Sequence, residues 1–410
     1  MARFKLAAAL LGCLAGAVGL GGAARAEPVK LTWFMWSGSE PEVVAWKHVA
    51  ELVTAKHPDI SVEFQTSSFP EYWTKLPALA AAGKLPDIVS LQSLRAPGFA
   101  GLLEPLDARI KADRFDIASF EPSIVKGLSR DGRQFGLPYD FGPLVLFYNH
   151  DMFVKAGVAL PKPGWTEAEF MAAAKALTKD GNFGFAISEP DAFIAFARSR
   201  GARYLNDQGG LDLGNAALKQ AFTDYAALVR TDKVAPLFPA SGTLSSAVAN
   251  GRFTAGNVAM YVDGPWQLIN VKKKANFTVG LAPVPVRSAG SITVTAGSGF
   301  GIAATSKNKD AAWKAIQVMT GPEAEQYLAE AGRAFSARTA FQKNWFDNAA
   351  QGVVGAREAI AAALTTAEPL TTTPNWATVS ALFLQYAPLA YVGSEPAAKV
   401  LDTIQNLASQ

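Results

Sequence analysis

The chain has 410 residues, of which 50% are hydrophobic and 18% are charged. This length allows two or three domains with cores of their own, and the composition excludes a disordered protein. The formal net charge is only +3 and the one short basic run is Lys272–Lys274, so the charge pattern argues against a nucleic-acid-binding protein.

The first 26 residues have the pattern of a secretory signal peptide. A positively charged start with Arg3 and Lys5 precedes an apolar run that ends at Leu20, and residues 24–26 read A-R-A, a small-residue cleavage site. We therefore predict an exported protein whose mature chain begins at Glu27. A transmembrane anchor is disfavoured because the apolar run is short and interrupted by glycine.

The only cysteine, Cys13, lies within this segment, in a sequence that faintly resembles a lipoprotein box. Cleavage after residue 26 would leave a chain without cysteine, which excludes disulfides, thiolate metal sites and cysteine nucleophiles. The three histidines, His48, His57 and His150, form no metal-binding motif. The sequence also contains no P-loop and no G-x-S-x-G motif. We expect neither a cofactor nor a bound metal ion.

Strand and helix patterns alternate in the first quarter of the chain. Apolar β-rich runs predict strands at 29–36, 60–66 and 87–91, with a helix at 71–83 between the last two. Ser39 and Glu42 form a predicted capping box for a helix that follows the first strand. This alternation predicts a parallel α/β sheet.

Residues 135–138 and 144–149 are predicted strands of different sheets. The interruption between them contains Tyr139 and Phe141, and such an aromatic pair fits a crossover between two lobes better than a plain turn. A second capping box at Thr166 and Glu169 begins another helix.

The rest of the chain continues the α/β pattern, and a glycine-containing kink is expected within the strand at 292–304, at Gly297–Gly299. The remaining predicted elements are helices near 191–200, 215–230 and 310–320, a further helix from Pro322, two helices within 374–408, and a strand at 277–283.

The segment at 255–267 reads AGNVAMYVDGPWQ and predicts a buried strand followed by a sharp turn. Gly264 is the predicted N-cap of the next helix, and Pro265 suits its first position. Trp266 should therefore lie at the C-terminal end of a strand, where ligands bind in open α/β sheets. Core packing is an equally good local explanation for this tryptophan.

Aromatic and hydrogen-bonding side chains recur at the predicted strand ends. Sugar C–H faces stack on aromatic rings, and carboxylate, amide and guanidinium groups bind hydroxyls. The set therefore suits an uncharged, hydroxyl-rich ligand. It consists of Trp36, Trp73, Trp266, Trp376, Glu40, Gln92, Arg95, Asp140, Asp263, Ser298 and Arg338.

Seven motifs follow one another along the predicted mature chain. They are LTWFMWSGSEPE, AAGKLPDIVSLQS, GLPYDFGPLVLFYNHDMFVKAGV, WTEAEFMAAAKALT, FTAGNVAMYVDGPWQL, FGIAATSKNKDAAWKAIQVMT and GPEAEQYLAEAGRAFSAR. In this order, the chain resembles bacterial extracellular solute-binding proteins of the sugar-binding type, the family that includes maltose-binding protein.

The resemblance implies the two-lobed α/β fold of type II periplasmic binding proteins. Each lobe would be a doubly wound sheet flanked by helices, and the ligand would bind in the cleft between them. The N-terminal lobe would comprise residues 27–138 and 298–337, and the C-terminal lobe residues 139–297 and 338–410.

The resemblance also implies binding residues. Trp266 occupies the position of the family's sugar-stacking tryptophan. The loop of Arg338 reads Phe335-Ser336-Ala337-Arg338 and lacks the proline that is usual there. The other positions that match family binding loops or lie near the implied cleft are Ser37, Ser39, Glu40, Gln92, Arg95, Asp140, Phe141, Ser298, Gly299, Phe300 and Trp376.

The implied function is the substrate-binding component of an ABC importer. A monomeric, non-enzymatic protein would bind a carbohydrate and deliver it to the membrane permease subunits. Two alternatives stay open. Arg95, Arg338 and helix N-termini could hold glycerol phosphate or another anionic polyol. Asp140 and Asp263 could instead be the carboxylate pair of an exported carbohydrate-active enzyme.

Overall fold

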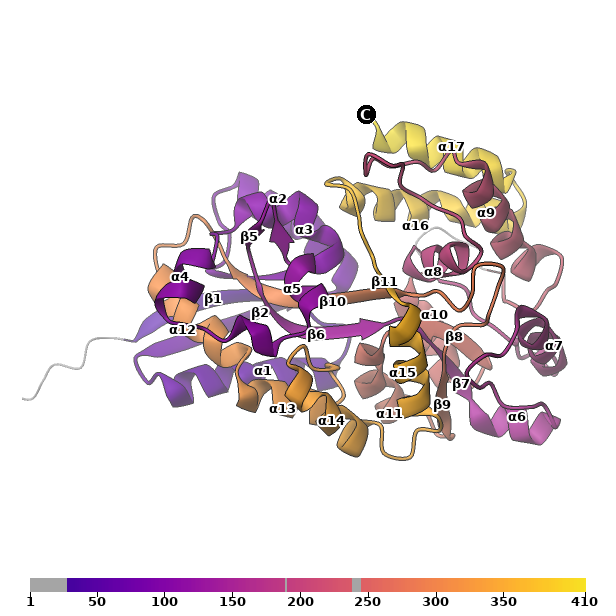
Figure 1. Ribbon diagram of the computed structural model, residues 1–410, viewed down its shortest axis with the longest axis horizontal. Helices are drawn as coiled ribbons and strands as arrows, with labels where there is room; N and C mark the ends of the chain where they lie inside the picture. The colour runs from indigo at the N-terminus through magenta and orange to yellow at the C-terminus, as the bar shows by residue number, and fades with distance from the viewer. Residues whose placement is uncertain (1–27, 189, 238–244) are drawn as a thin grey trace, which may run out of the picture.

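The computed structural model describes residues 28–188, 190–237 and 245–410. The predicted signal peptide, Cys13 and Glu27 lie outside this part of the chain. The described residues form two lobes, each with its own sheet, as Figure 1 shows. The predicted two-lobed α/β fold is therefore confirmed. Within the described ranges, no helix combines the length and the apolar character needed to cross a bilayer.

The first lobe contains a six-stranded sheet. Its order is β11-β10-β3-β1-β2, and β6 pairs with β10. β1 runs parallel to β2 and β3 as predicted, whereas β10 runs antiparallel to β3 and β6. The strands are β1 (Val29–Trp36), β2 (Ile60–Ser67), β3 (Ile88–Gln92), β6 (Leu137–Pro143), β10 (Val294–Ile302) and β11 (Glu368–Pro369).

Helices cover both faces of this sheet, with α2 and α3 above it and α1 and α13 below it in Figure 1. Trp46 on α1 meets Trp33 on β1, with ring centroids 5.8 Å apart. The helices are α1 (Glu40–Lys56), α2 (Phe69–Ala81), α3 (Ala96–Phe99), α4 (Asp107–Ala112), α5 (Pro122–Gly127), α12 (Lys309–Met319), α13 (Pro322–Glu330) and α14 (Gln342–Asn344); β4 (Ser129–Arg130) and β5 (Arg133–Gln134) form a small hairpin.

The second lobe is built on a three-stranded sheet of order β8-β7-β9, in which β7 pairs antiparallel with both neighbours. The strands are β7 (Val145–Asn149), β8 (Met260–Asp263) and β9 (Val279–Ala282). Its helices are α6 (His150–Ala156), α7 (Glu167–Leu177), α8 (Asp191–Ser199), α9 (Ala216–Arg230), α10 (Ser246–Thr254), α11 (Leu268–Lys274), α15 (Ala356–Thr366), α16 (Trp376–Val392) and α17 (Ala397–Ala408).

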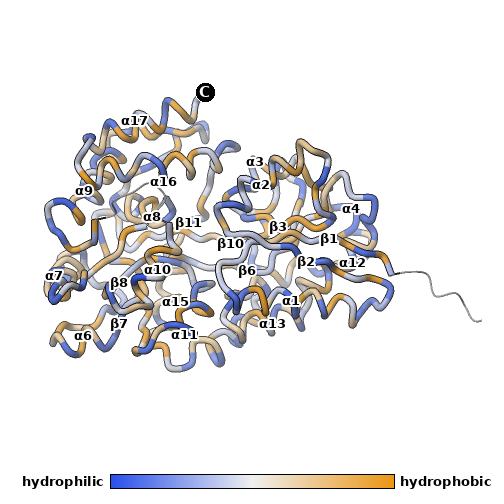
Figure 2. Tube along the Cα trace, turned by 180° about the vertical axis from the view of Figure 1, so that it is seen from behind, coloured by the Kyte–Doolittle hydropathy of each residue, from blue (hydrophilic) through white to orange (hydrophobic). Residues whose placement is uncertain are grey.

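The C-terminal helices pack through one apolar face. In Figure 2, hydrophobic and hydrophilic stretches alternate along α17. Its Val400, Leu401 and Ile404 are buried, and the helix packs against α16 and α9. This is the pattern expected of an amphipathic helix at the edge of a globular lobe.

The crossover predicted at residues 139–143 is not an interruption between two strands. It lies inside β6, which pairs with β10 from Leu137↔Phe300 to Pro143↔Thr295. The chain enters β7 only after Leu144. The two strands that lead from one lobe to the other are therefore held to each other by a ladder of backbone hydrogen bonds.

The kink predicted at Gly297–Gly299 is wrong. β10 is one continuous, fully buried strand, with only a shift of its register against β6 between Ser298 and Gly299. A Cβ atom on Gly297 would lie 2.3 Å from the carbonyl oxygen of Asp140, and one on Gly299 would lie 2.4 Å from that of Leu137. These glycines allow the backbones of β6 and β10 to approach each other closely, and they do not break the strand.

The second predicted capping box is confirmed. Glu169 N–H donates to Thr166 Oγ1 over 3.2 Å, and Thr166 N–H donates to Glu169 Oε2 over 2.6 Å. The first box is only half formed. Ser39 Oγ accepts from Glu42 N–H, but the Glu42 carboxylate accepts from Gly38 N–H and from the Asn270 side chain on α11. Tertiary contact with the other lobe thus redirects Glu42 from its local capping role.

Candidate functional site

A cleft lies between the two lobes, with about 1520 Å³ of empty volume including its mouth to solvent. The first lobe contributes the ends of β1 and β3 and the starts of α1 and α2. The second contributes the end of β8 and the starts of α8, α10 and α11. The paired strands β6 and β10 supply Asp140, Gly297 and Ser298 to its lining.

Trp266 provides an aromatic face on the second-lobe wall. It lies in the 3-10 turn η4 (Pro265–Gln267), directly after β8, and Gly264 is the N-cap as predicted. Its side chain is partly exposed and lines the cleft. On the first-lobe wall, Trp36 ends β1 and packs against Phe69 with ring centroids 5.6 Å apart. Aromatic rings therefore line the cleft from both lobes.

Several buried polar atoms in the cleft lining have no hydrogen-bond partner in the described structure. Leaving such an atom unpaired costs about 1–3 kcal/mol, which a polar ligand would recover. Acceptors and donors both occur in this set. They are Asp140 Oδ1, Asp263 Oδ2, Asn270 Oδ1, Arg95 Nε, Arg333 Nε and Nη1, and Ser380 Oγ.

Arg333 joins the polar groups at the base of the cleft. Its Nη1 lies 3.5 Å from Asp140 Oδ2, and its Nε lies 3.7 Å from Glu42 Oε2. The guanidinium stacks over the ring of Trp46 at 4.6 Å. Burial raises the pKa of Asp140 to about 6, although the positive charge of Arg333 opposes this shift. The arginine thus holds two carboxylates in place without using all of its own donors.

Asp263 is the corresponding carboxylate on the second-lobe wall. Its Oδ1 accepts from Gly264 N–H over 2.7 Å, while its Oδ2 has no partner among the described residues. Burial raises the pKa of Asp263 to about 7, and the neighbouring negative charge of Asp191 adds to the shift. A ligand hydroxyl that donates to Oδ2 would satisfy this buried oxygen.

The structure brings about half of the sequence-predicted site residues together. Those that line the cleft are Trp36, Gln92, Arg95, Asp140, Asp263, Trp266 and Ser298. Ser37, Ser39 and Glu40 lie beside it, and their loop contributes Gly38 and Glu42 to the lining instead. Ser37 Oγ donates to the carbonyl of Ser39, so this hydroxyl serves the loop itself.

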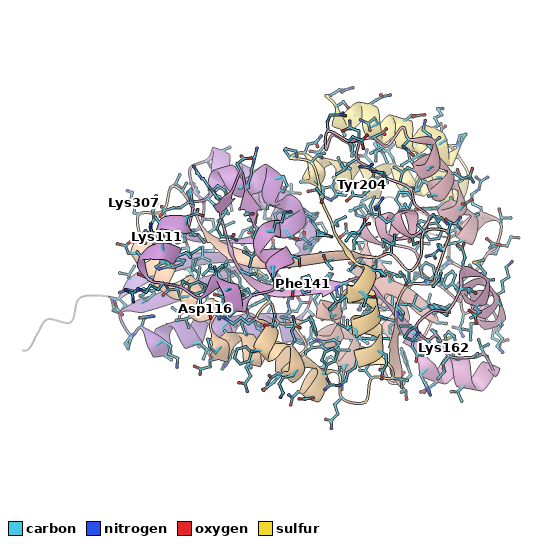
Figure 3. The ribbon with its side chains drawn as sticks, in the orientation of Figure 1. Lys111, Asp116, Phe141, Lys162, Tyr204 and Lys307 are labelled. Carbon is cyan, nitrogen blue, oxygen red and sulfur yellow. The ribbon has the colours of Figure 1, made fainter. Side chains whose placement is uncertain are left out.

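Strand alternation separates Phe141 from the cleft. Neighbouring residues of a strand point to opposite faces, so Phe141 faces away from Asp140. It lines a different cavity, of about 780 Å³, at the junction of the lobes, where Figure 3 labels it. Phe300 is buried against Tyr139, with ring centroids 4.7 Å apart, and neither it nor Gly299 lines the cleft.

Arg338 and Trp376 also lie outside the cleft lining. Arg338 Nε donates to the carbonyl of Thr320, Nη1 donates to Ser119 Oγ, and the guanidinium stacks on Phe120. Trp376 has no exposed surface and packs against Tyr204, which Figure 3 labels in the second lobe. Both side chains are used within the lobes.

Sequence reasoning missed several polar residues of the cleft lining, among them Glu42, Asp191, Asn270 and Arg333. Asn270 lies four residues after Trp266, and helical periodicity could have placed the two on one face. Glu42 matched a capping box, which hid its second role. No local signal distinguished Asp191 or Arg333.

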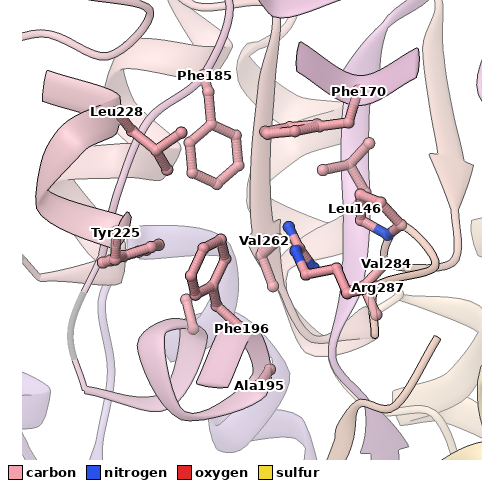
Figure 4. Close-up of a pocket in the computed structure, with 12 residues that line it drawn as sticks. Leu146, Phe170, Phe185, Ala195, Phe196, Tyr225, Leu228, Val262, Val284 and Arg287 are labelled. Atoms are coloured by element: carbon pink, nitrogen blue, oxygen red, sulfur yellow. The ribbon is translucent and has the colours of Figure 1, made fainter. Parts of the chain in front are cut away.

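A separate cavity inside the second lobe is lined mainly by apolar side chains. Figure 4 shows Arg287 reaching into it between Phe170 and Phe196. Arg287 Nε lies 3.0 Å from Glu167 Oε1, and Nη1 donates to Ser199 Oγ over 3.0 Å. Because the Arg287 donors already have partners within the protein, we interpret this cavity as a packing feature of the second lobe and not as a ligand site.

Two solved structures share this fold. A substrate-binding protein of Listeria monocytogenes, in complex with cycloalternan, superposes with a TM-score of 0.84 and 24% identity over 93% of this chain and 98% of its own. A maltose-bound protein of T. maritima superposes with a TM-score of 0.79 and 23% identity over 93% and 99% of the two chains.

Sequence comparison also finds named relatives. The lactose-binding protein of Rhizobium radiobacter is 30% identical over 243 residues, which cover 57% of this chain and 55% of the relative. The maltotriose-binding protein of Pyrococcus abyssi is 26% identical over 313 residues, or 72% and 64% of the two chains. The family model of bacterial extracellular solute-binding proteins matches residues 49–352. Because this match spans well over half of the chain, the protein belongs to the bacterial extracellular solute-binding protein family.

Proposed function

We propose that this protein is the periplasmic substrate-binding component of an ABC importer and that it binds a monosaccharide or oligosaccharide in the cleft. The observation that carries the proposal is the set of buried, unpartnered donors and acceptors in a cleft that Trp36 and Trp266 also line. Each sugar hydroxyl can donate and accept at once, and each sugar ring offers an apolar face. The names of the lactose- and maltotriose-binding relatives agree with this ligand class.

The proposed contacts have distinct roles. Trp266 stacks on a sugar ring, while Asp140, Asp263 and Asn270 accept hydrogen bonds from sugar hydroxyls. Arg95 and Arg333 donate to sugar oxygens. Gln92 and Ser298 complete the polar lining. We propose that Asp140 and Asp263 bind hydroxyls rather than act as a catalytic pair, because the family consists of binding proteins.

The charges of the cleft favour a neutral ligand over an anionic polyol. Four acidic residues line the cleft, Glu42, Asp140, Asp191 and Asp263, against the three basic residues Arg95, Arg333 and Lys274. A phosphate would lie among these carboxyl groups in a partly desolvated space, where each one that is ionised repels it. Arg338, which a phosphate site was expected to use, binds Thr320 and Ser119 instead.

Closure around the ligand would follow from the two-lobed architecture. We propose that the lobes follow the expected division into residues 27–138 with 298–337 and residues 139–297 with 338–410, except that residues 139–143, 294–297, 338–344 and 368–369 belong to the first lobe. The strands β6 and β10 lead from one lobe to the other. A ligand that contacts both walls favours the closed state by its greater affinity for that state. The closed form would then dock on the permease subunits of the importer.

The experiment that tests the proposal is a thermal-shift screen of the mature protein, followed by calorimetry of the hits. The panel holds neutral mono- and oligosaccharides, polyols, and their phosphates. A ligand that binds only the folded state stabilises it by about 2.7 kcal/mol when its concentration is a hundredfold above Kd, and this raises the melting temperature. We expect shifts with neutral sugars. Shifts confined to phosphorylated polyols would contradict the proposal, and so would turnover of the sugar.

A further inference from the structure

Arg95 and Asp191 face the same cleft from different lobes. Arg95 ends the 3-10 turn η1 (Ser93–Arg95) after β3 of the first sheet. Asp191 is the first residue of α8 in the second lobe, and both side chains line the cleft. Neither residue belongs to the other charged cluster of the cleft, in which Arg333 faces Glu42 and Asp140.

Arg95 is fixed in position but not neutralised within its own lobe. Its guanidinium lies between aromatic rings, 5.0 Å from the centroid of Phe69 and 4.6 Å from that of Trp73. Its Nη1 donates to the neutral amide of Gln92, and its Nε has no partner in the described chain. Only 8% of the residue is exposed. No ion pair of Arg95 within 4 Å occurs in the described ranges, so its charge is available to the opposite wall.

Asp191 likewise has no ion pair within its own lobe among the described residues. Its charged neighbour in that lobe is Asp263. The negative charge of Asp191 disfavours ionisation of the Asp263 carboxyl group, because like charges repel each other. Burial raises the pKa of Asp191, and the positive charge of Arg95 opposes that shift. The reverse also holds, because Asp191 opposes the lowering of the pKa of Arg95 to about 10 by burial. Arg95 and Asp191 are thus opposite charges on facing walls of one cleft, and among the described residues neither has an ion pair within 4 Å.

We propose that Arg95 and Asp191 form a charge pair across the cleft that stabilises the closed arrangement of the lobes, so that Asp191 is a positioning residue for ligand binding. Attraction between opposite charges is strong at short range and low dielectric, and it weakens when water separates the walls. Opening the cleft therefore weakens the pair, and closing it restores the pair. The effect on ligand affinity rests on the proposed function, but the effect on closure does not.

The first test measures closure without any ligand. Lys75 on α2 and Lys399 on α17 are exposed residues of the two lobes, and each pairs at the surface with a glutamate four residues earlier in the chain. Spin labels on Lys75→Cys and Lys399→Cys in the mature chain report the interlobe distance by pulsed electron resonance. We expect Asp191→Asn and Arg95→Gln each to move the distance distribution towards longer distances. The double variant should show no larger shift than either single variant, because one interaction can be removed only once.

Asp207→Asn is the matched control, since this exposed aspartate of the second lobe pairs with Arg203 and does not line the cleft. It should leave the distances unchanged. Near-ultraviolet circular dichroism checks that each variant is folded. An unchanged distance in Asp191→Asn, or shifts of the two single variants that add in the double variant, would overturn the proposal.

A second readout uses the best sugar from the panel. Asp191→Asn should bind it roughly tenfold more weakly. Arg95→Gln should lose more, because Arg95 is also proposed to donate to the sugar, and the double variant should bind no more weakly than Arg95→Gln alone. If no sugar binds the unmodified protein, the proposed function fails while the distances still decide the charge pair. If sugar binds and the variants bind it equally well with unchanged distances, only the charge pair fails.

Discussion

Trp266 is a residue whose position follows from its immediate neighbours. Pro265 and Gly264 end β8 and start η4, which turns the indole into the cleft rather than into the sheet. Trp376 has the same side chain but begins α16 inside the second lobe, with no exposed surface. The two tryptophans thus make a matched pair for mutation.

We predict that Trp266→Ala weakens sugar binding by roughly 1–3 kcal/mol, because the stacking surface is lost. Trp376→Phe should leave the affinity unchanged while it lowers the melting temperature, because it removes volume from the core. Isothermal titration calorimetry measures the first effect and thermal unfolding the second. Equal affinity of Trp266→Ala and the unmodified protein would remove Trp266 from the site.

At the scale of elements, the contact between β6 and β10 depends on the absence of side chains. A Cβ atom on Gly299 would meet the carbonyl oxygen of Leu137 at 2.4 Å and the side chain of Leu128 at 2.5 Å. The carbonyl belongs to the backbone of β6, so it can withdraw only if the two strands separate. Since these strands also carry Asp140 and Ser298 into the cleft, their spacing positions the site.

Gly299→Ala is therefore expected to lower the free energy of unfolding by about 1–3 kcal/mol, the range for overpacking. Urea denaturation followed by circular dichroism measures the change. Gly101→Ala is the control, because nothing lies within 4 Å of the added Cβ atom and the backbone there is not left-handed. If both variants lost the same free energy of unfolding, the spacing of the two strands would not be the cause of the destabilisation.

At the scale of the whole molecule, buried carboxyl groups link stability to pH. Burial raises the pKa of Asp140 to about 6 and that of Asp263 to about 7, and it raises the pKa of Glu325 well above its usual value. Glu325 has no exposed surface, and its Oε1 has no partner among the described residues. The folded protein therefore holds protons that the unfolded chain has already released near pH 5.

The stability that these carboxyl groups contribute in their protonated form is fully present below about pH 4, near which they titrate in the unfolded chain. It is lost as the pH rises through their higher pKa values in the folded protein. We predict that the ligand-free protein becomes less stable between pH 5 and pH 8. Glu325→Gln, which stays neutral, should reduce this decline, so its stability relative to the unmodified protein should improve towards pH 8. Urea titrations at several pH values test this, and parallel curves for the two proteins would contradict it.

The sequence by itself determined the local parts of this protein. Hydrophobic periodicity and caps predicted β1, α13 and the Thr166–Glu169 capping box, because each depends on residues a few positions apart. It also placed Trp266 at the end of β8. The order of its motifs indicated the two-lobed α/β fold, which the structure and the family match confirm.

Tertiary structure decided what those residues face. Glu42 binds Asn270 of the other lobe, Arg338 binds Ser119 and Thr320 within its own, and Arg333 joins Asp140 over a long sequence separation. The glycines expected to break β10 instead admit β6 against it. Each of these outcomes depends on residues that are distant in sequence. A local sequence pattern contains no information about which distant residue will lie nearby once the chain has folded.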